Sequence, residues 1–151
     1  MKLSQGFTLL ELMIAVAIVT FLSVLTLPSL MKTLGRSRRA EAYLYLRTLA
    51  QAQKVYYAEN GKYTSILAGP GSLGWAPEGS HLYTYGFAGT QSGVGHFVGS
   101  SGVDSSALSG TRTTASEFIV AAAGKIYGDA LDVLTIDQSG AIKIVTDSLT
   151  S

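Results

Sequence analysis

The residues with the clearest chemical potential lie near the start of the chain, in the segment Gly6-Phe7-Thr8-Leu9-Leu10-Glu11. Glu11 is a carboxylate within an apolar stretch, where an ionisable side chain costs roughly 2.5 to 3.5 kcal/mol to place in a membrane. A cut after Gly6 would give Phe7 a free α-amine, which is positively charged near neutral pH. That amine would lie one helical turn from Glu11. We therefore predict an ion pair between the Phe7 amine and Glu11, within one chain or between neighbouring copies.

An apolar helix is expected to position this pair. Leu12 to Met31 is a run of 20 consecutive residues without a charge, and as a helix it would be about 30 Å long, which matches the core of a bilayer. Pro28 lies inside the run and removes one backbone hydrogen bond, so a kink or a loosened turn is expected just before it. Gly35 is a second weak point. The sequence thus predicts a long helix that is curved or segmented.

These features together resemble the N-terminus of a type IV pilin or a related pseudopilin. The resemblance rests on the short leader Met1 to Gly6, on Phe7-Thr8-Leu9-Leu10-Glu11-Leu12-Met13-Ile14, and on Pro28 within the apolar helix. It implies that a prepilin peptidase cleaves after Gly6 and N-methylates Phe7. It also implies that Glu11 pairs with the Phe7 amine of another subunit during filament assembly. Methylation keeps the charge of the amine, so the electrostatic argument is unchanged.

The resemblance also implies a function and a set of partners. The chain would be a structural subunit of a type IV pilus, a helical homopolymer of its own copies. A pilus assembly ATPase and an inner-membrane platform protein would supply the work of assembly. The monomer would reside in the inner (cytoplasmic) membrane, surrounded by the lipid bilayer, and the assembled filament would be extracellular.

Three alternatives stay open. Within the family, the chain could be a pseudopilin of a type II secretion system or a minor pilin. From another class, it could be a single-pass membrane-anchored domain that binds a ligand and does not polymerise. The sequence does not decide between adhesion, motility, DNA uptake and secretion as the purpose of a filament.

The expected fold class is α+β, with a long N-terminal helix whose second half packs on a small, largely antiparallel β-sheet, as the resemblance implies. We expect a leader peptide at 1–6, a hydrophobic transmembrane and assembly helix at 7–34, and a globular domain at 35–151. Within that domain we expect an amphipathic helix over about 36–59, a loop over 60–80 and a β-sheet region over 81–151.

Periodicity supports the second half of the helix. Residues that recur every three or four positions predict the face that packs on the sheet: Arg38, Ala42, Tyr45, Leu49, Ala52 and Tyr56. Arginine and lysine on the other face are expected to stay in water. Asn60-Gly61 predicts the end of the helix, because glycine readily adopts the left-handed conformation of a helix C-terminus.

Four stretches have the composition of strands, and they cover residues 81–87, 117–122, 131–136 and 141–145. The last two flank Asp137-Gln138-Ser139-Gly140 and predict a hairpin. The segment from Gly89 to Thr114 is rich in Gly, Ser and Thr. It is expected to be a surface excursion between strands or a mobile loop.

Charge is low overall, at +1, but four basic residues follow the apolar run: Lys32, Arg36, Arg38 and Arg39. They could contact lipid headgroups or simply be solvated. The positive-inside rule alone would place them in the cytoplasm, whereas the resemblance places the domain on the other side, and we follow the resemblance. The chain lacks the strongly basic balance of nucleic-acid-binding proteins, so no specific nucleic acid partner is expected.

The sequence offers no constellation typical of an enzyme. His81 and His96 are the only histidines, and there is no cysteine and therefore no disulfide. We expect no catalytic residue and no cofactor. Asp129, Asp132 and Asp137 are close enough in sequence to suggest calcium. However, Asp132 is expected just before a strand and Asp137 at the start of a turn, which are ordinary positions for Asp, so no metal site is predicted.

Overall fold

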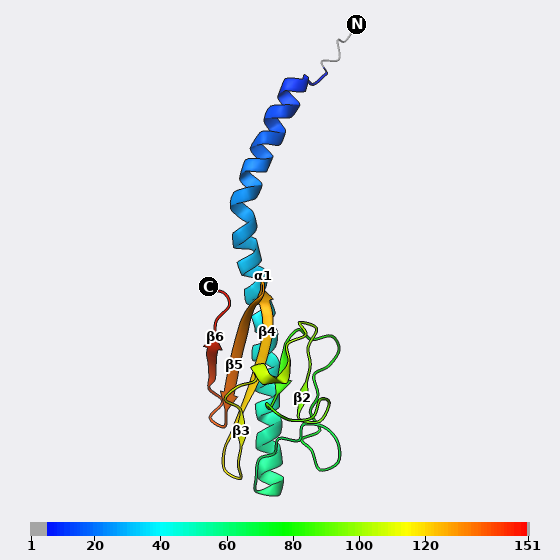
Figure 1. Ribbon diagram of the computed structural model, residues 1–151, viewed down its shortest axis with the longest axis vertical. Coiled ribbons are helices and arrows are strands. Elements are labelled where there is room, and N and C mark those ends of the chain that lie inside the picture. Colours follow the sequence, from blue (N-terminus) through cyan, green and yellow to red (C-terminus); the bar gives the residue numbers. More distant parts are fainter. Residues whose placement is uncertain (1–5, 151) are drawn as a thin grey trace.

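The computed structural model describes residues 6–150, and its dominant element is one helix, α1, which spans Leu9–Asn60. Figure 1 shows α1 as a curved rod whose first half stands clear of the rest of the chain, while its second half lies along a sheet. The predicted α+β class is confirmed. Residues 1–5 of the expected leader peptide lie outside the described residues.

The helix α1 continues through Pro28 without interruption, so it is curved rather than segmented (Figure 1). Hydroxyl side chains in its apolar half donate to carbonyl oxygens one turn earlier, as Thr20 does to Val16 at 2.8 Å and Ser23 to Val19 at 2.8 Å. Such bonds satisfy the hydroxyl groups inside the helix itself, so these side chains need no polar partner in an apolar environment.

The helix ends where the sequence predicts. Gly61 adopts a left-handed conformation with φ of 68°, and its N–H donates to the carbonyl oxygen of Tyr57 at 2.8 Å. Only glycine adopts this conformation at little cost, which is why it commonly follows the last helical residue.

The sheet contains six strands in the order β2-β1-β4-β5-β6, with β3 pairing to β4, and every pairing is antiparallel. The strands are β1 (Thr84–Gly86), β2 (His96–Phe97), β3 (Arg112–Thr113), β4 (Phe118–Tyr127), β5 (Ala130–Asp137) and β6 (Ile142–Thr146). The predicted hairpin is confirmed as β5 and β6. Strand β1 is shorter than predicted, and β4 extends five residues beyond the predicted end at 122.

The main core lies between α1 and one face of the sheet. The buried residues of α1 are Gly35, Arg39, Ala42, Leu46, Leu49, Ala50 and Gln53. They face side chains such as Val120 and Leu134 from β4 and β5. The predicted stripe was therefore partly wrong: Arg38 is exposed and Tyr56 is only half-buried. In place of Arg38, the stripe contains Arg39.

The opposite face of the sheet is also covered. Val103 and Leu108, on either side of the short helix η1 (Ser105–Ala107), pack against Ala121 and Ala123 of β4. These residues lie in the segment from 89 to 114, which was predicted to be a surface excursion or a mobile loop. That prediction is wrong for this part, because its few apolar side chains cover the face of the sheet that points away from α1.

The predicted loop between α1 and the sheet is confirmed, since 61–83 contains neither helix nor strand. Trp75 anchors it to the helix: its indole N–H donates to the hydroxyl of Thr48 at 3.1 Å. The indole also packs edge-on against Tyr45 and Tyr85, with ring centroids 6.4 and 6.1 Å apart. The loop is therefore held against α1 by aromatic packing.

Candidate functional site

The predicted site residues at the start of the chain are brought together by the first turn of α1. Thr8 is the N-cap, and its hydroxyl accepts a hydrogen bond from the Glu11 N–H at 3.2 Å. In return, Glu11 Oε2 accepts hydrogen bonds from the Thr8 N–H and from the Thr8 hydroxyl, both at 2.9 Å. This reciprocal arrangement is a capping box. It holds the Glu11 carboxylate against the N-terminus of its own helix, where the helix dipole favours negative charge.

The role of Thr8 was not predicted, although a Thr followed three residues later by Glu is a known signature of this cap. Gly6 and Phe7 precede the helix, and Phe7 is 90% exposed. Gly6, Phe7, Thr8 and Glu11 line one open hollow. In the uncleaved chain the nitrogen of Phe7 belongs to a peptide bond, so its pairing with Glu11 stays a prediction.

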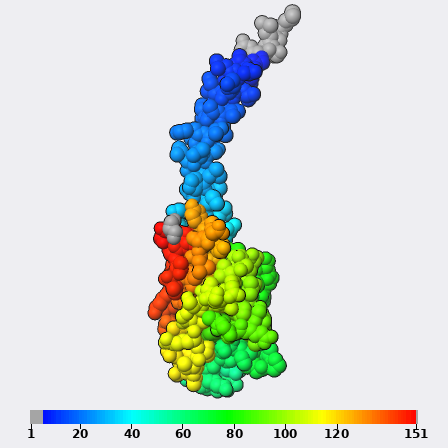
Figure 2. All heavy atoms as spheres, viewed as in Figure 1, coloured from blue at the N-terminus to red at the C-terminus, as the bar shows by residue number. Residues whose placement is uncertain are grey.

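The first half of α1 presents an apolar surface that nothing in the described chain covers. Every residue from 9 to 34 is exposed except Lys32, which is half-buried. The helix contains an 18-residue window with a mean hydropathy of 2.4, none of it buried, and it is long and apolar enough to cross a membrane. Figure 2 shows this half as a narrow stalk that projects from the domain. Such a surface needs lipid or other apolar helices around it.

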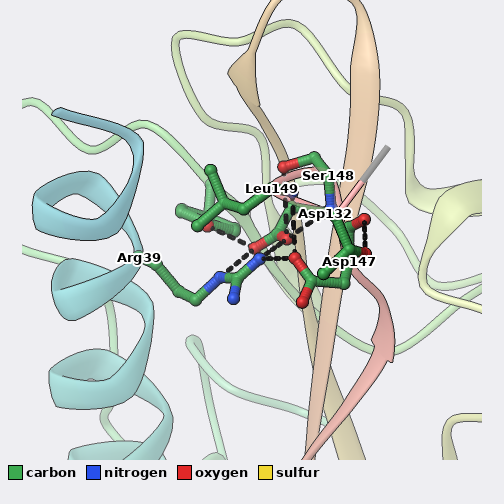
Figure 3. Close-up of polar contacts among 7 residues, drawn as sticks. Arg39, Asp132, Asp147, Ser148 and Leu149 are labelled. Atoms are coloured by element: carbon green, nitrogen blue, oxygen red, sulfur yellow. Dashed lines mark hydrogen bonds and ion pairs between the residues drawn. The ribbon is translucent and has the colours of Figure 1, made fainter. Parts of the chain in front are cut away.

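Just beyond the stalk, Arg39 is directed into the domain (Figure 3). Its Nε donates to Asp132 Oδ2 at 3.1 Å and its Nη2 to Asp132 Oδ1 at 2.5 Å. Nη2 also donates to the carboxylate of Asp147. The expectation that Arg39 contacts lipid or water is therefore wrong. It lies about one helical turn from the exposed Arg36, but its guanidinium faces the sheet, where a buried carboxylate neutralises it.

Asp132 is completely buried and lies within β5. The expectation that it lies just before the strand is therefore wrong. Besides Arg39, its carboxylate accepts hydrogen bonds from the Tyr83 hydroxyl at 2.7 Å and from the Ser148 N–H at 3.2 Å. Burial and the bond to Asp132 raise the pKa of Tyr83, so its hydroxyl stays protonated and remains a donor. Donors from three parts of the chain thus satisfy one buried charge.

The three carboxylates considered for calcium do not converge. Asp129 is fully exposed and lies 3.6 Å from Lys125, while Asp137 accepts a hydrogen bond from the Ser139 N–H at 2.9 Å. Asp132 is engaged by Arg39, Tyr83 and Ser148. Over residues 6–150 the structure has no group of three His, Cys, Asp or Glu side chains arranged to hold a metal ion.

The residues after β6 form a strap across α1, which we call the C-terminal strap and define as Asp147–Leu149. Asp147 bonds to Arg39, and the Leu149 N–H donates to Asp147 Oδ1 at 2.9 Å. Both contacts lower the pKa of Asp147, with the Arg39 guanidinium the larger cause. Leu149 packs against Gly35, where a Cβ would lie 2.7 Å from Leu149 Cδ2. Glycine at this position therefore lets the strap approach the helix.

Two family profiles match consecutive parts of the chain. Residues 1–27 match the prokaryotic N-terminal methylation motif, and residues 28–98 match a family described as type IV minor pilin ComP, DNA uptake sequence receptor. This chain belongs to the type IV pilin family. The observed fold of this pilin, one long apolar helix on an antiparallel sheet, agrees with that assignment.

Known relatives are similar to the pilin over part of its length. It is 38% identical over 82 residues to the type IV major pilin protein PilA of Myxococcus xanthus, a match that covers 54% of this chain and 36% of that protein. It is 35% identical over 74 residues to the type IV wide pilus major component PilA4 of Thermus thermophilus, a match that covers 49% of this chain and 56% of that protein.

A third relative is the type IV major pilin protein PilE1 of Neisseria gonorrhoeae, which is 39% identical over 61 residues, 40% of this chain and 37% of that protein. The matches thus span between about a third and just over half of the length of these relatives.

Proposed function

We propose that this pilin is a structural subunit of a type IV pilus, cleaved after Gly6, N-methylated at Phe7 and polymerised through α1. The observation that carries the proposal is the uncovered apolar surface over 9–34 with one carboxylate, Glu11, at its start. Transfer of that surface from lipid to the helices of other copies changes the hydrophobic free energy little. Close packing and polar pairing must therefore provide the specificity of assembly.

Glu11 is proposed to set the register between copies. Within residues 6–150, the hydrogen bonds to its carboxylate all go to Oε2 and come from Thr8, which leaves Oε1 to accept from the Phe7 amine of a neighbouring subunit. The capping box fixes the side chain in advance, so less conformational entropy is lost when that pair forms. Pro28 has no N–H for the carbonyl of Val24, and the helix can loosen there as subunits pack.

The proposed life cycle begins in the inner membrane. The monomer would be stored there with 7–34 in lipid and with the domain on the outer side, after cleavage and methylation by a prepilin peptidase. A pilus assembly ATPase and an inner-membrane platform protein would drive the subunits into an extracellular filament. The pilin family consists of structural proteins, and no enzymatic role is proposed.

A DNA-binding role is the activity that the description of the ComP family suggests. That family is described as a receptor for DNA uptake sequences. In this chain, Lys62 is the only lysine or arginine between 61 and 111, a range that takes in most of the domain part of the match. Nucleic-acid-binding surfaces carry clustered basic residues, whereas the cluster in this chain, Lys32 to Arg39, follows directly after the apolar run of α1, so we propose no specific nucleic acid partner.

Sheared surface filaments separate the candidate roles. We expect electron microscopy and mass spectrometry to find this chain as the abundant filament protein, which identifies a major pilin. Trace amounts would identify a minor pilin. Complete absence would contradict the proposal and favour a pseudopilin or an anchored domain that does not polymerise.

Glu11→Ala tests the pairing itself. The substitution is expected to leave cleavage and membrane insertion intact but to reduce incorporation into filaments strongly. Glu59→Ala, which removes an exposed carboxylate near the other end of α1, is the matched control and should assemble normally. Normal piliation by Glu11→Ala would refute the pairing mechanism.

A further inference from the structure

Four basic residues lie near the point where the apolar half of α1 meets the domain. We call this group the basic collar and define it as Lys32, Arg36 and Arg38 from α1 together with Lys125 from β4. The uncharged run of α1 ends at Met31, so a helix that spans a bilayer reaches the headgroup layer at the collar.

The turn between β4 and β5 lies at the end of the domain from which the apolar half of α1 emerges (Figure 1). Lys32 Nζ lies 5.9 Å from the centroid of the Tyr127 ring, and Arg38 Nη1 donates to the carbonyl oxygen of Ile126 at 3.2 Å. Figure 1 shows the orange tip of this hairpin beside α1, at the end of the domain from which the apolar half emerges. Two segments nearly 90 residues apart therefore bring basic residues to the same end of the domain.

The charge balance of the collar is positive. Arg36, Arg38 and Lys125 are exposed and Lys32 is half-buried. The acidic side chain of the β4–β5 turn is Asp129, 3.6 Å from Lys125. Arg39, although adjacent in sequence, contributes little because Asp132 and Asp147 neutralise it. Four cations thus face one exposed carboxylate, which is a surface that suits an anionic ligand.

We propose that the basic collar binds the headgroups of anionic phospholipids and holds the domain against the membrane before polymerisation. This rests on the proposed storage of the monomer in the membrane. Each basic residue beside a membrane span raises the affinity for anionic lipid by about fivefold. Tyrosine, here Tyr127, is typical of the membrane interface. In the proposed topology the collar lies on the outer side of the membrane, where the positive-inside rule expects few basic residues. Binding of anionic lipid would explain why basic residues are present there.

The test uses the full chain reconstituted in nanodiscs. Because the chain contains no cysteine, Ser37→Cys places a single environment-sensitive fluorophore within the collar, and Glu59→Cys places one at the far end of α1. We expect the emission at position 37 to shift to the blue when phosphatidylglycerol is added to phosphatidylcholine, and the shift to disappear in high salt. The label at position 59 should not respond.

Substitutions identify the residues responsible. Arg36→Gln with Lys125→Gln should raise the phosphatidylglycerol fraction needed for half of the shift several-fold, while the matched pair Arg47→Gln with Lys54→Gln, also exposed, should not. The lipid proposal would be overturned if the emission were the same in both lipids, or if the control pair of substitutions weakened the shift as much as Arg36→Gln with Lys125→Gln does. Failure of the chain to insert into phosphatidylcholine nanodiscs would instead contradict membrane storage, so the two failures are distinguishable.

Discussion

Arg39 on α1 and Asp132 on β5, which lie 93 residues apart in sequence, form a two-pronged ion pair in the interior, with donor–acceptor distances of 3.1 and 2.5 Å. The pair lies just past the end of the apolar half of α1. It joins the helix to β5, an internal strand of the sheet, near the start of that strand. Asp147 joins the same guanidinium, so the C-terminal strap depends on this pair as well.

Loss of Arg39 should destabilise the domain strongly. Arg39→Gln leaves Asp132 buried with an incomplete set of donors, and removing one partner of a buried ion pair typically costs about 3 to 5 kcal/mol of unfolding free energy. Denaturant unfolding of the full chain in detergent would measure this. Arg36→Gln, an exposed neighbour, should change the unfolding free energy by no more than about 0.5 kcal/mol. Similar values for the two variants would refute a structural role for the pair.

Gly35 and Leu149 should be coupled. In a helix interior, Gly→Ala normally stabilises by about 1 kcal/mol, but a Cβ at position 35 would meet Leu149 Cδ2 at 2.7 Å. We therefore expect Gly35→Ala to give its full gain in unfolding free energy only when Leu149→Ala is also present. Gly35→Ala by itself should give a smaller gain or a loss. A double-mutant cycle on unfolding free energy measures the difference. Additive effects would show that the strap does not pack on the helix at this point.

The strap should loosen in acid. The pKa of Asp147 is lowered in the folded state by Arg39 and by the Leu149 N–H. A carboxyl group with a lowered folded pKa contributes stability that is present above its unfolded pKa of about 3.9 and is lost as the pH falls through the folded pKa. Asp147→Asn should therefore be less stable than the parent chain at pH 6, and the difference should shrink below about pH 4. A difference that is constant with pH would contradict this assignment.

Thr8 should control the order of the first turn. Thr8→Val removes the hydroxyl that accepts from the Glu11 N–H and donates to Glu11 Oε2, and loss of an N-cap typically costs about 0.5 to 2 kcal/mol. Amide exchange at Glu11, followed in micelles, should accelerate in Thr8→Val and stay nearly unchanged in Thr8→Ser. Unchanged exchange in both variants would mean that the capping box does not persist in a membrane-like environment.

Local patterns predicted much of the fold. The extent of the apolar run, the end of α1 at Asn60-Gly61 and the hairpin of β5 and β6 each depend on residues that are close in sequence. Such signals act through backbone conformation and periodicity, which a single sequence displays directly. The same holds for the grouping of Gly6, Phe7 and Glu11, which lie close together in sequence at the start of α1.

The buried position of Arg39 depended on a distant residue and was not predicted. A cluster of basic residues after an apolar run usually lies in water. No residue near Arg39 in sequence indicates that Asp132 will be its partner. One signal was available: counting back from Ala42 and Leu46 in helical steps leads to Arg39 and Gly35, which continue the buried stripe. The back of the sheet was missed for a similar reason, because Val103 and Leu108 are isolated apolar residues in a polar segment and their burial depends on β4.

The first residue of the protein isolated from filaments tests the central claim most directly. Top-down mass spectrometry should find a chain that begins at Phe7 with one additional methyl group on its amine, because cleavage after Gly6 creates the charge that Glu11 is proposed to neutralise. A filament protein, or a membrane-resident protein, that still begins at Met1 and carries no methyl group would contradict the account.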